Sequence, residues 1–248
     1  MLYTLGLSIT TSTYVEDTIE SIMVQTFIDF EVIIQNNAVD NLEKQKIRSA
    51  IQKYLADGRV KYFENDSTIP ACDILNSLLY RASGEYFCII SEADIIDKKY
   101  LEIFNALILK YNHCHIFHCR VKIVDGAGKL LEISPLCPEF ELQADFIYHT
   151  IWQKRIHFMT DFIVSTERLK KIGGFEKFQQ VSSLDELTWY KMAKNDIAYT
   201  SYPCLTHRSI PLNGDASLQQ IEGRFKEIDY FISESKKIIF DKKFNNQL

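Results

Sequence analysis

Short apolar segments alternate with amphipathic segments along the first 111 residues of this 248-residue chain, and this alternation restricts the fold more than any other feature. Strands that alternate with helices of about 10 to 15 residues are typical of right-handed βαβ units in an open, mostly parallel sheet. The segment 86–90 is wholly apolar, as expected for a strand that is buried on both faces. Strands are predicted at 3–9, 30–34, 60–63 and 86–90, and helices at about 15–23, 42–55, 69–82 and 98–111.

Two local signals mark helix ends in this half. Thr13 and Glu16 have the spacing of a capping box, which predicts a helix start at Thr13. Gly84 follows the third predicted helix, where a glycine is expected at the C′ position.

The pattern changes after residue 111. The segments 116–124 and 129–133 predict a hairpin, and residues 135–160 are irregular and rich in aromatic side chains. Since no linker, repeat or low-complexity tract divides the chain, we expect one composite domain at 1–215, with a helical extension at 216–248 packed on it. The other predicted elements are a strand at 162–164, a helix that ends at Gly173 and Gly174, a helix at 184–194, a strand at 197–202 and a terminal helix at 219–240.

Composition excludes several classes of protein. Hydrophobic residues make up 46% and charged residues 25%, which is typical of a globular chain and not of a disordered one. No apolar run is long enough to span a bilayer, and the N-terminus lacks a signal peptide's basic region. A net charge of −5 argues against broad nucleic-acid binding. The 6 cysteines form no CxxC pair, as expected of reduced thiols, so we predict a soluble cytoplasmic protein.

Polar residues follow three predicted strands, at 10–13, 35–37 and 91–94. Ligands of open α/β sheets bind beyond the carboxyl ends of the strands. Glu92 and Asp94 are separated by one residue, so in an extended backbone both side chains project from the same side. Carboxylates suit Mg²⁺ or Mn²⁺. Capping of the next helix, or pairing with Lys98 and Lys99, is the alternative.

Four segments, in order along the chain, resemble the signature of family 2 glycosyltransferases. The segment 18–34 reads TIESIMVQTFIDFEVII, close to the family's "ti.Sil.Qty.dfEiii". Asn76, Ala82 and the sequence GEY at 84–86 match "N.gl..A.GeY". The sequence IGGFE at 172–176 looks like "iGgFde", and LD at 184–185 followed by WYKMA at 189–193 looks like "ED…lW.rla".

The resemblance implies a GT-A fold, a Rossmann-like α/β architecture with a nucleotide-binding half at 1–111 and an acceptor half at 112–215. It also implies an inverting glycosyltransferase. Such an enzyme would move a sugar from a nucleoside diphosphate, with uridine favoured, to a hydroxyl of a saccharide or lipid-linked acceptor. In this reading Glu92-Ala93-Asp94 stands where the family has Asp-x-Asp. Asp94 would bind Mg²⁺ or Mn²⁺, Glu92 would lie near the ribose or the metal's waters, and Asp185 would be the general base.

Further donor contacts are expected from the resemblance at Thr10, Thr11, Asn36 and His207. The chain departs from the family in three places: Thr10-Thr11-Ser12 replaces Pro-Thr-Tyr-Asn, Asn36 replaces an aspartate that reads uracil, and Leu75 replaces an arginine. An amide can both donate to and accept from a uracil edge, so Asn36 is compatible with uridine.

Structural alternatives exist for several of these residues. Asp185 suits a helix N-terminus through the helix dipole, and His207 with Arg208 is equally well a surface pair. The aromatics Phe140, Phe146, Tyr148, Trp152 and Phe158 are either acceptor contacts or core. The terminal helix either docks on the domain or rests on an anionic membrane surface. A zinc site formed by His113, Cys114, His115, His118 and Cys119 is disfavoured, because adjacent strand residues face opposite sides.

Two other functions compete with transfer. The same fold can hold a nucleotide or glycan without turnover, which the changes at 10–12 and Asn36 would suit. A nucleotidyltransferase is disfavoured, because residues 10–13 contain neither glycine nor lysine to hold a triphosphate.

Overall fold

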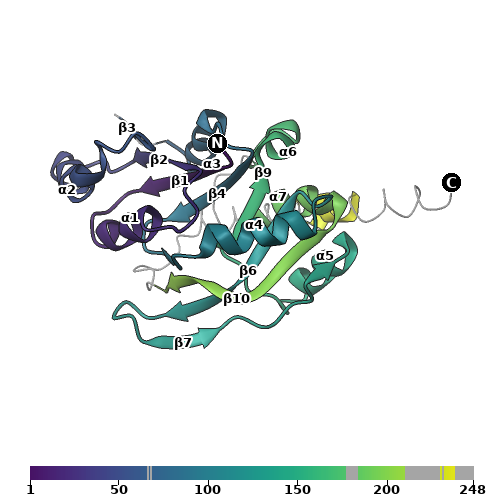
Figure 1. Ribbon diagram of the computed structural model, residues 1–248. Helices are drawn as coiled ribbons and strands as arrows, with labels where there is room; N and C mark the ends of the chain where they lie inside the picture. Colours follow the sequence, from purple (N-terminus) through teal and green to yellow (C-terminus); the bar gives the residue numbers. More distant parts are fainter. Residues whose placement is uncertain (66, 68, 177–183, 210–229, 231, 238–248) are drawn as a thin grey trace, which may run out of the picture.

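In the described part of the chain, ten strands form one sheet, around which the helices are arranged (Figure 1). The computed structural model describes residues 1–65, 67, 69–176, 184–209, 230 and 232–237, with the side chains of 184 and 185 left out. In chain order the strands are β1 (Tyr3–Ile9), β2 (Phe30–Asn36), β3 (Val60–Glu64), β4 (Tyr86–Ser91), β5 (Ile95–Ile96), β6 (Ile116–Val124), β7 (Leu130–Ile133), β8 (Phe140–Glu141), β9 (Phe162–Ser165) and β10 (Ile197–Arg208).

The strand order is β3-β2-β1-β4-β9-β6-β10-β5, with β7 paired to β6 and β8 to β10. The first four strands, β1 to β4, are parallel to one another, and β6 is parallel to β10. Strand β9 lies between these two parallel groups and is antiparallel to both of its neighbours. The predicted α/β class with a mostly parallel, helix-flanked sheet is therefore confirmed, and one sheet joins the two halves of the chain.

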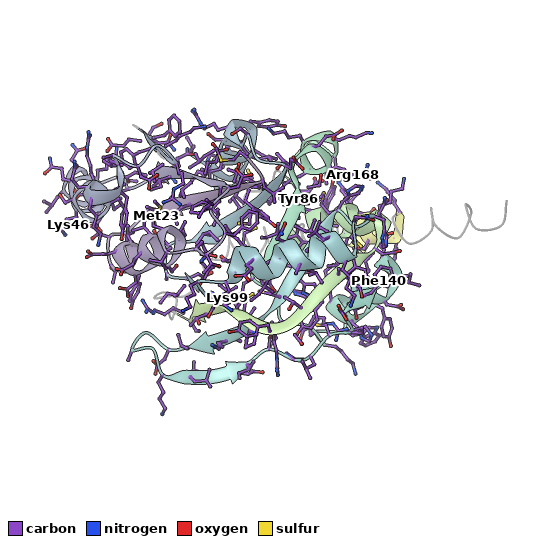
Figure 2. All side chains as sticks on the ribbon, viewed as in Figure 1. Met23, Lys46, Tyr86, Lys99, Phe140 and Arg168 are labelled. Atoms are coloured by element: carbon purple, nitrogen blue, oxygen red, sulfur yellow. The ribbon has the colours of Figure 1, made fainter. Side chains whose placement is uncertain are left out.

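Helices cover both faces of the sheet, and α1 and α4 lie together in front of it in Figure 1. Successive residues of each strand face opposite layers, so Val32 and Ile34 belong to one hydrophobic core and Ile33 to the other. Side chains fill the space between helices and sheet, as Figure 2 shows around Tyr86. The helices are α1 (Val15–Met23), α2 (Asn41–Ile51), α3 (Ala71–Arg81), α4 (Tyr100–Lys110), α5 (Gln143–Ile151), α6 (Thr166–Lys171) and α7 (Leu184–Met192), with 3-10 turns at Gln52–Tyr54, Met159–Asp161 and Ala193–Asn195.

Two predicted helix ends are wrong. Helix α1 is preceded by Tyr14 and has no side-chain cap, so Thr13 does not form the predicted capping box. Helix α3 ends at Arg81, before the predicted C′ glycine. Gly84 is required for a different reason, because a Cβ atom there would lie 2.6 Å from the backbone carbon of Tyr3.

Two residues of the matching segments hold elements together. The side-chain amide of Asn76 on α3 donates to the carbonyl oxygen of Phe175 at 2.9 Å and accepts from its N–H at 2.8 Å. Between them and α6 lie Gly173 and Gly174, which have positive φ angles of 98° and 83°. A Cβ atom on Gly174 would lie 2.2 Å from the amide oxygen of Asn76. Packing therefore explains why Asn76, Gly173 and Gly174 occur in the matching segments.

Glu31 is a buried carboxylate that ties three strands to the loop before β4. It accepts hydrogen bonds from Thr4 Oγ1 at 2.6 Å, Lys61 Nζ at 2.6 Å and both the N–H and hydroxyl of Ser83. Burial acts to raise the pKa of Glu31, but the hydrogen bonds from Lys61, Ser83 and Thr4 outweigh it and hold the pKa at about 2. The carboxylate is thus ionised at neutral pH.

We expect Glu31→Gln to lower the free energy of unfolding at pH 7 by about 1.5–3 kcal/mol, the range for hydrogen bonds to charged groups. Because the pKa falls from 4.5 to about 2 on folding, this contribution is complete above pH 4.5 and is lost as pH falls toward 2. Urea unfolding between pH 7 and pH 3 measures it. Lys61→Met is the control, with a smaller loss because three donors remain. A gap between wild type and Glu31→Gln that stays constant with pH would contradict the assignment.

Nothing among the described helices has the length and apolar character that a bilayer crossing requires. Most of the predicted extension at 216–248 lies outside the described residues, as do its packing and its membrane contact. Tyr230 and residues 232–237 are helical, as predicted for that segment.

Candidate active site

The acidic residues after β4 lie in a turn. Glu92 and Ala93 form the turn, and the N–H of Asp94 donates to the carbonyl oxygen of Ser91 at 3.1 Å. The extended geometry predicted for this segment is therefore wrong. Glu92 and Asp94 point to different partners, so each needs its own interpretation.

Three buried polar side chains, two on helix α1 and one just after it, hold the backbone around this turn. Thr18 Oγ1 donates to the carbonyl oxygen of Glu92 at 3.0 Å. Ser21 Oγ accepts from the N–H of Ile96 at 3.2 Å. Gln25 donates to the carbonyl oxygen of Asp97 at 2.8 Å and accepts from the N–H of Leu101. These contacts explain the polar positions of the segment 18–34, since they fix the backbone on both sides of Asp94.

Glu92 binds the end of β1. Its carboxylate accepts from the N–H and the hydroxyl of Thr10 and from the N–H of Thr11, the last two at 2.7 and 3.0 Å. Both threonines are exposed, and Ala93 is buried behind them. The structure thus brings Thr10, Thr11 and Glu92 together, and it gives Glu92 a loop-holding contact. A role for Glu92 at a ribose or a metal stays a prediction.

The side chains of Asp94 and His207 are in contact at the centre of the candidate site. The Asp94 side chain is fully buried, and its Oδ1 lies 2.8 Å from His207 Nδ1. The His207 ring stacks on Phe158 with 3.7 Å between centroids and keeps about a quarter of its side chain exposed, at 24%. Asp94 Oδ2 is buried and has no hydrogen-bond partner among the described residues. A buried carboxylate oxygen without a donor is costly, so this atom marks a place for a cation or a donor.

Arg208 lies beside the start of helix α1. Its guanidinium sits 4.1 Å from the Tyr14 ring centroid, and its Nη2 is 3.7 Å from Asp17 Oδ2. The side chain is only 10% exposed, and its Nε and Nη1 have no partner in the described part of the chain. Two unpaired N–H groups on a nearly buried cation suit an anion.

The side chain of Asn36 contacts a different set of residues. It is fully buried at the end of β2, its Nδ2 donates to Tyr62 Oη at 2.9 Å and to the carbonyl oxygen of Lys44, and its Oδ1 accepts from the N–H of Ala38. All of its hydrogen-bonding atoms are therefore engaged inside the protein.

Asp185 belongs to the first turn of α7, and its side chain lies outside the described atoms. Helix α7 is fixed by Trp189, which is buried and stacks on Phe162 with 4.6 Å between centroids. Ala193, the last matching residue, is also buried. Two of the matching residues around Asp185, Trp189 and Ala193, are therefore explained by packing.

The aromatic residues of 135–160 differ in burial. Phe146 on α5 is core, whereas Tyr148 and Trp152 are 56% and 64% exposed and lie 6.3 Å apart. Phe140 stacks on Tyr111 at 5.6 Å. Phe158 contacts His207, a contact that sequence reasoning did not foresee because the two residues are 49 positions apart.

Thr160 is a supporting residue that the sequence did not indicate. It is buried, its hydroxyl accepts from the N–H of Ser91 at 3.0 Å, and its carbonyl oxygen accepts from Tyr100 Oη at 2.8 Å. It thus fastens the start of the acid turn to the 3-10 turn at Met159–Asp161. A lone threonine in an irregular segment carries no signal for such a contact.

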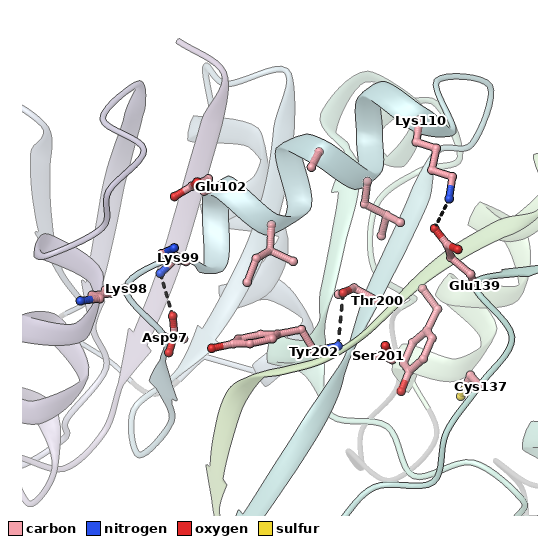
Figure 3. Close-up of a pocket in the computed structure, with 14 residues that line it drawn as sticks. Asp97, Lys98, Lys99, Glu102, Lys110, Cys137, Glu139, Thr200, Ser201 and Tyr202 are labelled. Carbon is pink, nitrogen blue, oxygen red and sulfur yellow. Dashed lines mark hydrogen bonds and ion pairs between the residues drawn. The ribbon is translucent and has the colours of Figure 1, made fainter.

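A separate cavity of about 870 Å³ lies between α4 and β10 (Figure 3). Its walls carry Asp97, Lys98, Lys110 and Tyr202, with Glu139 paired to Lys110. None of the predicted site residues whose side chains the structure describes lines it. Charges of both signs and a wide opening give it no evident ligand preference.

Comparison with known proteins supports the fold. No protein-family model matches the chain. It is 25% identical over 188 residues to an uncharacterized glycosyltransferase of Methanocaldococcus jannaschii, covering 75% of this chain and 62% of that protein. S. aureus TarS in complex with UDP-GlcNAc has a TM-score of 0.68 at 20% identity, covering 90% of this chain and 64% of that one. Mannosyltransferase PcManGT from Pyrobaculum calidifontis, in complex with GDP-Man and Mn²⁺, has a TM-score of 0.59 at 18% identity, covering 86% and 58%.

The chain spans less than two thirds of each of these three proteins. The resemblance to nucleotide-sugar glycosyltransferases is confirmed, and the protein has their GT-A fold.

Proposed function

We propose that this protein is a glycosyltransferase that moves a sugar from a nucleoside diphosphate to a hydroxyl group of a saccharide or lipid-linked acceptor, with inversion at the anomeric carbon. The observation that carries the proposal is the buried Asp94 carboxylate, with one oxygen on His207 and the other without a partner. It lies just beyond a central parallel strand, where ligands bind in open α/β sheets. The donor-bound structures of TarS and PcManGT support the same assignment.

The residues around Asp94 fit a divalent cation. Asp94 Oδ2 lacks a donor, and His207 Nδ1 lies against the other oxygen of the same carboxylate. Oxygen with nitrogen ligands suits Mn²⁺ better than Mg²⁺, which prefers oxygen alone. Asp94 and His207 would hold the ion, and a neighbour of the same fold, PcManGT, is in complex with Mn²⁺. When bound, such an ion neutralises the charge that develops on a departing diphosphate.

The chain's own residues would do the rest. Arg208, with two unpaired N–H groups, would contact the diphosphate. Glu92 would keep Thr10 and Thr11 in place beside the donor. Asp185, at the start of α7, would take the proton from the acceptor hydroxyl as it attacks. The exposed pair Tyr148 and Trp152 is a candidate surface for the acceptor sugar.

The base of the donor is proposed to be uracil, as in the UDP and UDP-GlcNAc complexes of TarS. Asn36 is engaged internally, so base recognition through it would require exchange of its present partners. The neighbouring backbone at the end of β2 is the alternative contact. A comparison of UDP with GDP therefore tests this part separately.

We expect UDP with Mn²⁺ to raise the melting temperature, because a ligand that binds only the native state adds about 2.7 kcal/mol at 100 times its Kd. UDP without metal should have little effect, and GDP a smaller one. Differential scanning fluorimetry with UDP, UDP-GlcNAc and GDP-Man, each with Mn²⁺ or EDTA, measures this, and release of UDP from the donor measures turnover. Binding without turnover would favour a silent binding module. No shift with any nucleotide and metal would reject both functions.

A further inference from the structure

A second cluster of metal-ligating side chains lies in the opposite layer of the sheet. His118 on β6, His157 before the 3-10 turn and Asp161 at its end each offer one atom, and the three atoms lie within 4.8 Å of one another. All three side chains are nearly or fully buried, with exposed fractions of 1%, 7% and 1%. The donor residues described above are not part of this cluster.

Three of the four ring nitrogens of these two histidines lack a hydrogen-bond partner among the described residues. His118 Nε2 and both ring nitrogens of His157 are buried without a hydrogen bond among the described residues. His157 Nδ1 faces Asp161 Oδ2 at 3.5 Å, which is beyond ordinary hydrogen-bond length. Buried imidazole nitrogens are normally hydrogen-bonded or bound to a metal, so three in one place indicate that a partner belongs there.

The surroundings of the cluster are apolar and rigid. Phe162 stacks on His118 at 5.5 Å, Phe146 lies 5.3 Å from the His157 ring, and Tyr199 lies 4.7 Å from His118. The Asp161 Oδ1 atom accepts from the N–H of Phe158 at 3.2 Å, which orients the carboxylate. Packing of this kind limits both water access and rotation of the rings.

Charge does not oppose a cation here. Asp161 carries a negative charge, and the neighbouring Arg155 is paired with buried Glu141.

We propose that His118, His157 and Asp161 bind one divalent transition-metal ion, with zinc favoured, and that this ion fastens the segment 157–161 to β6. Two imidazoles and one carboxylate form a known zinc ligand set, with water as the fourth ligand. Tetrahedral ligands at about 2.0–2.1 Å from zinc lie about 3.3 Å apart. The 3.5 Å pair already has this spacing, and small ring movements bring the third atom in.

Such an ion would act on the candidate active site through this segment. Phe158 stacks on His207, and Thr160 binds Ser91 at the start of the acid turn. Both contacts come from residues between the two proposed ligands His157 and Asp161. The ion would therefore be structural, and its presence does not depend on the proposed transferase function.

The test is zinc retention by the full chain. Protein incubated with Zn²⁺ and desalted should keep about one zinc per chain by elemental analysis, and zinc should raise its melting temperature. Asp161→Asn, which keeps the side-chain shape, and His157→Gln should each weaken zinc binding by at least about tenfold. The variant His113→Gln changes an exposed histidine at the same end of β6, and this protein should retain zinc fully.

Asp94→Asn separates this site from the donor site, because it should retain the zinc. Cobalt provides a direct readout on wild type that does not depend on how a variant folds, since Co²⁺ bound by imidazole in a low-coordinate site absorbs visible light. This band should be absent in Asp161→Asn. The proposal is overturned if wild type retains no zinc and shows no cobalt band, or if zinc is lost in Asp94→Asn and kept in Asp161→Asn.

Discussion

Asp94→Asn should lower kcat/KM for release of UDP from a sugar donor by about 10²–10³, equivalent to about 2.7–4 kcal/mol of transition-state stabilisation. The substitution preserves the size of a fully buried side chain and removes the charge that a cation requires. The affinity for UDP should also become independent of Mn²⁺. Initial rates at several Mn²⁺ concentrations, with calorimetric titration of UDP, measure both effects.

Asp97→Asn is the matched control for this experiment. Asp97 lies three residues later, on the other side of the short strand β5, and its carboxylate accepts only from the backbone N–H of Lys99 among the contacts described, at 2.9 Å. Its loss should leave metal dependence unchanged. If Asp94→Asn keeps wild-type turnover and wild-type metal dependence, Asp94 and His207 form a structural pair and the proposed function loses its main support.

The fold was predictable wherever a local pattern decides the element. The strand at 3–9 and the hairpin at 116–133 have the predicted bounds to within one residue, because apolar runs end there at polar residues or at a glycine turn. Helix α5 was not predicted. This helix has no side-chain cap. It is held in place by Phe146 in the core and by Gln143, which donates to the carbonyl oxygen of Tyr190. Such contacts are tertiary and leave no local signal.

The same distinction applies to the candidate site. Sequence reasoning found Asp94 and His207 separately, from a strand end and from the resemblance. It could not pair them, because their contact depends on β10 lying next to β5 in the sheet. These two strands are far apart in the sequence, so no local pattern shows that they are neighbours. The role of Glu92 was missed for a local reason, since a tight turn replaces extended backbone at 92–93. His157 and Asp161 reach His118 only through the antiparallel β9, which carries them alongside β6.

Asp185→Asn should lower kcat by about 10²–10⁴ and leave the affinity for UDP with Mn²⁺ unchanged, since a general base acts only as the acceptor is deprotonated. A purely structural Asp185 would give a different result. An acid in the first turn of a helix contributes about 0.3–1 kcal/mol through the helix dipole, so its loss would lower the melting temperature slightly and barely change the rate. The two roles can therefore be distinguished: loss of a general base lowers kcat, whereas loss of a helix-dipole contact lowers mainly the melting temperature.

The control for Asp185 is Glu186→Gln, the same chemical change one residue later in α7. Both variants alter the charge at the start of the helix, so a dipole effect would appear in both, whereas loss of a base would appear in Asp185→Asn alone. Turnover is followed as UDP release at saturating donor and Mn²⁺, with melting curves for both proteins. A rate for Asp185→Asn within about threefold of wild type would exclude a base that contributes the expected 10²–10⁴. The proton of the acceptor would then have to leave through another group near α7.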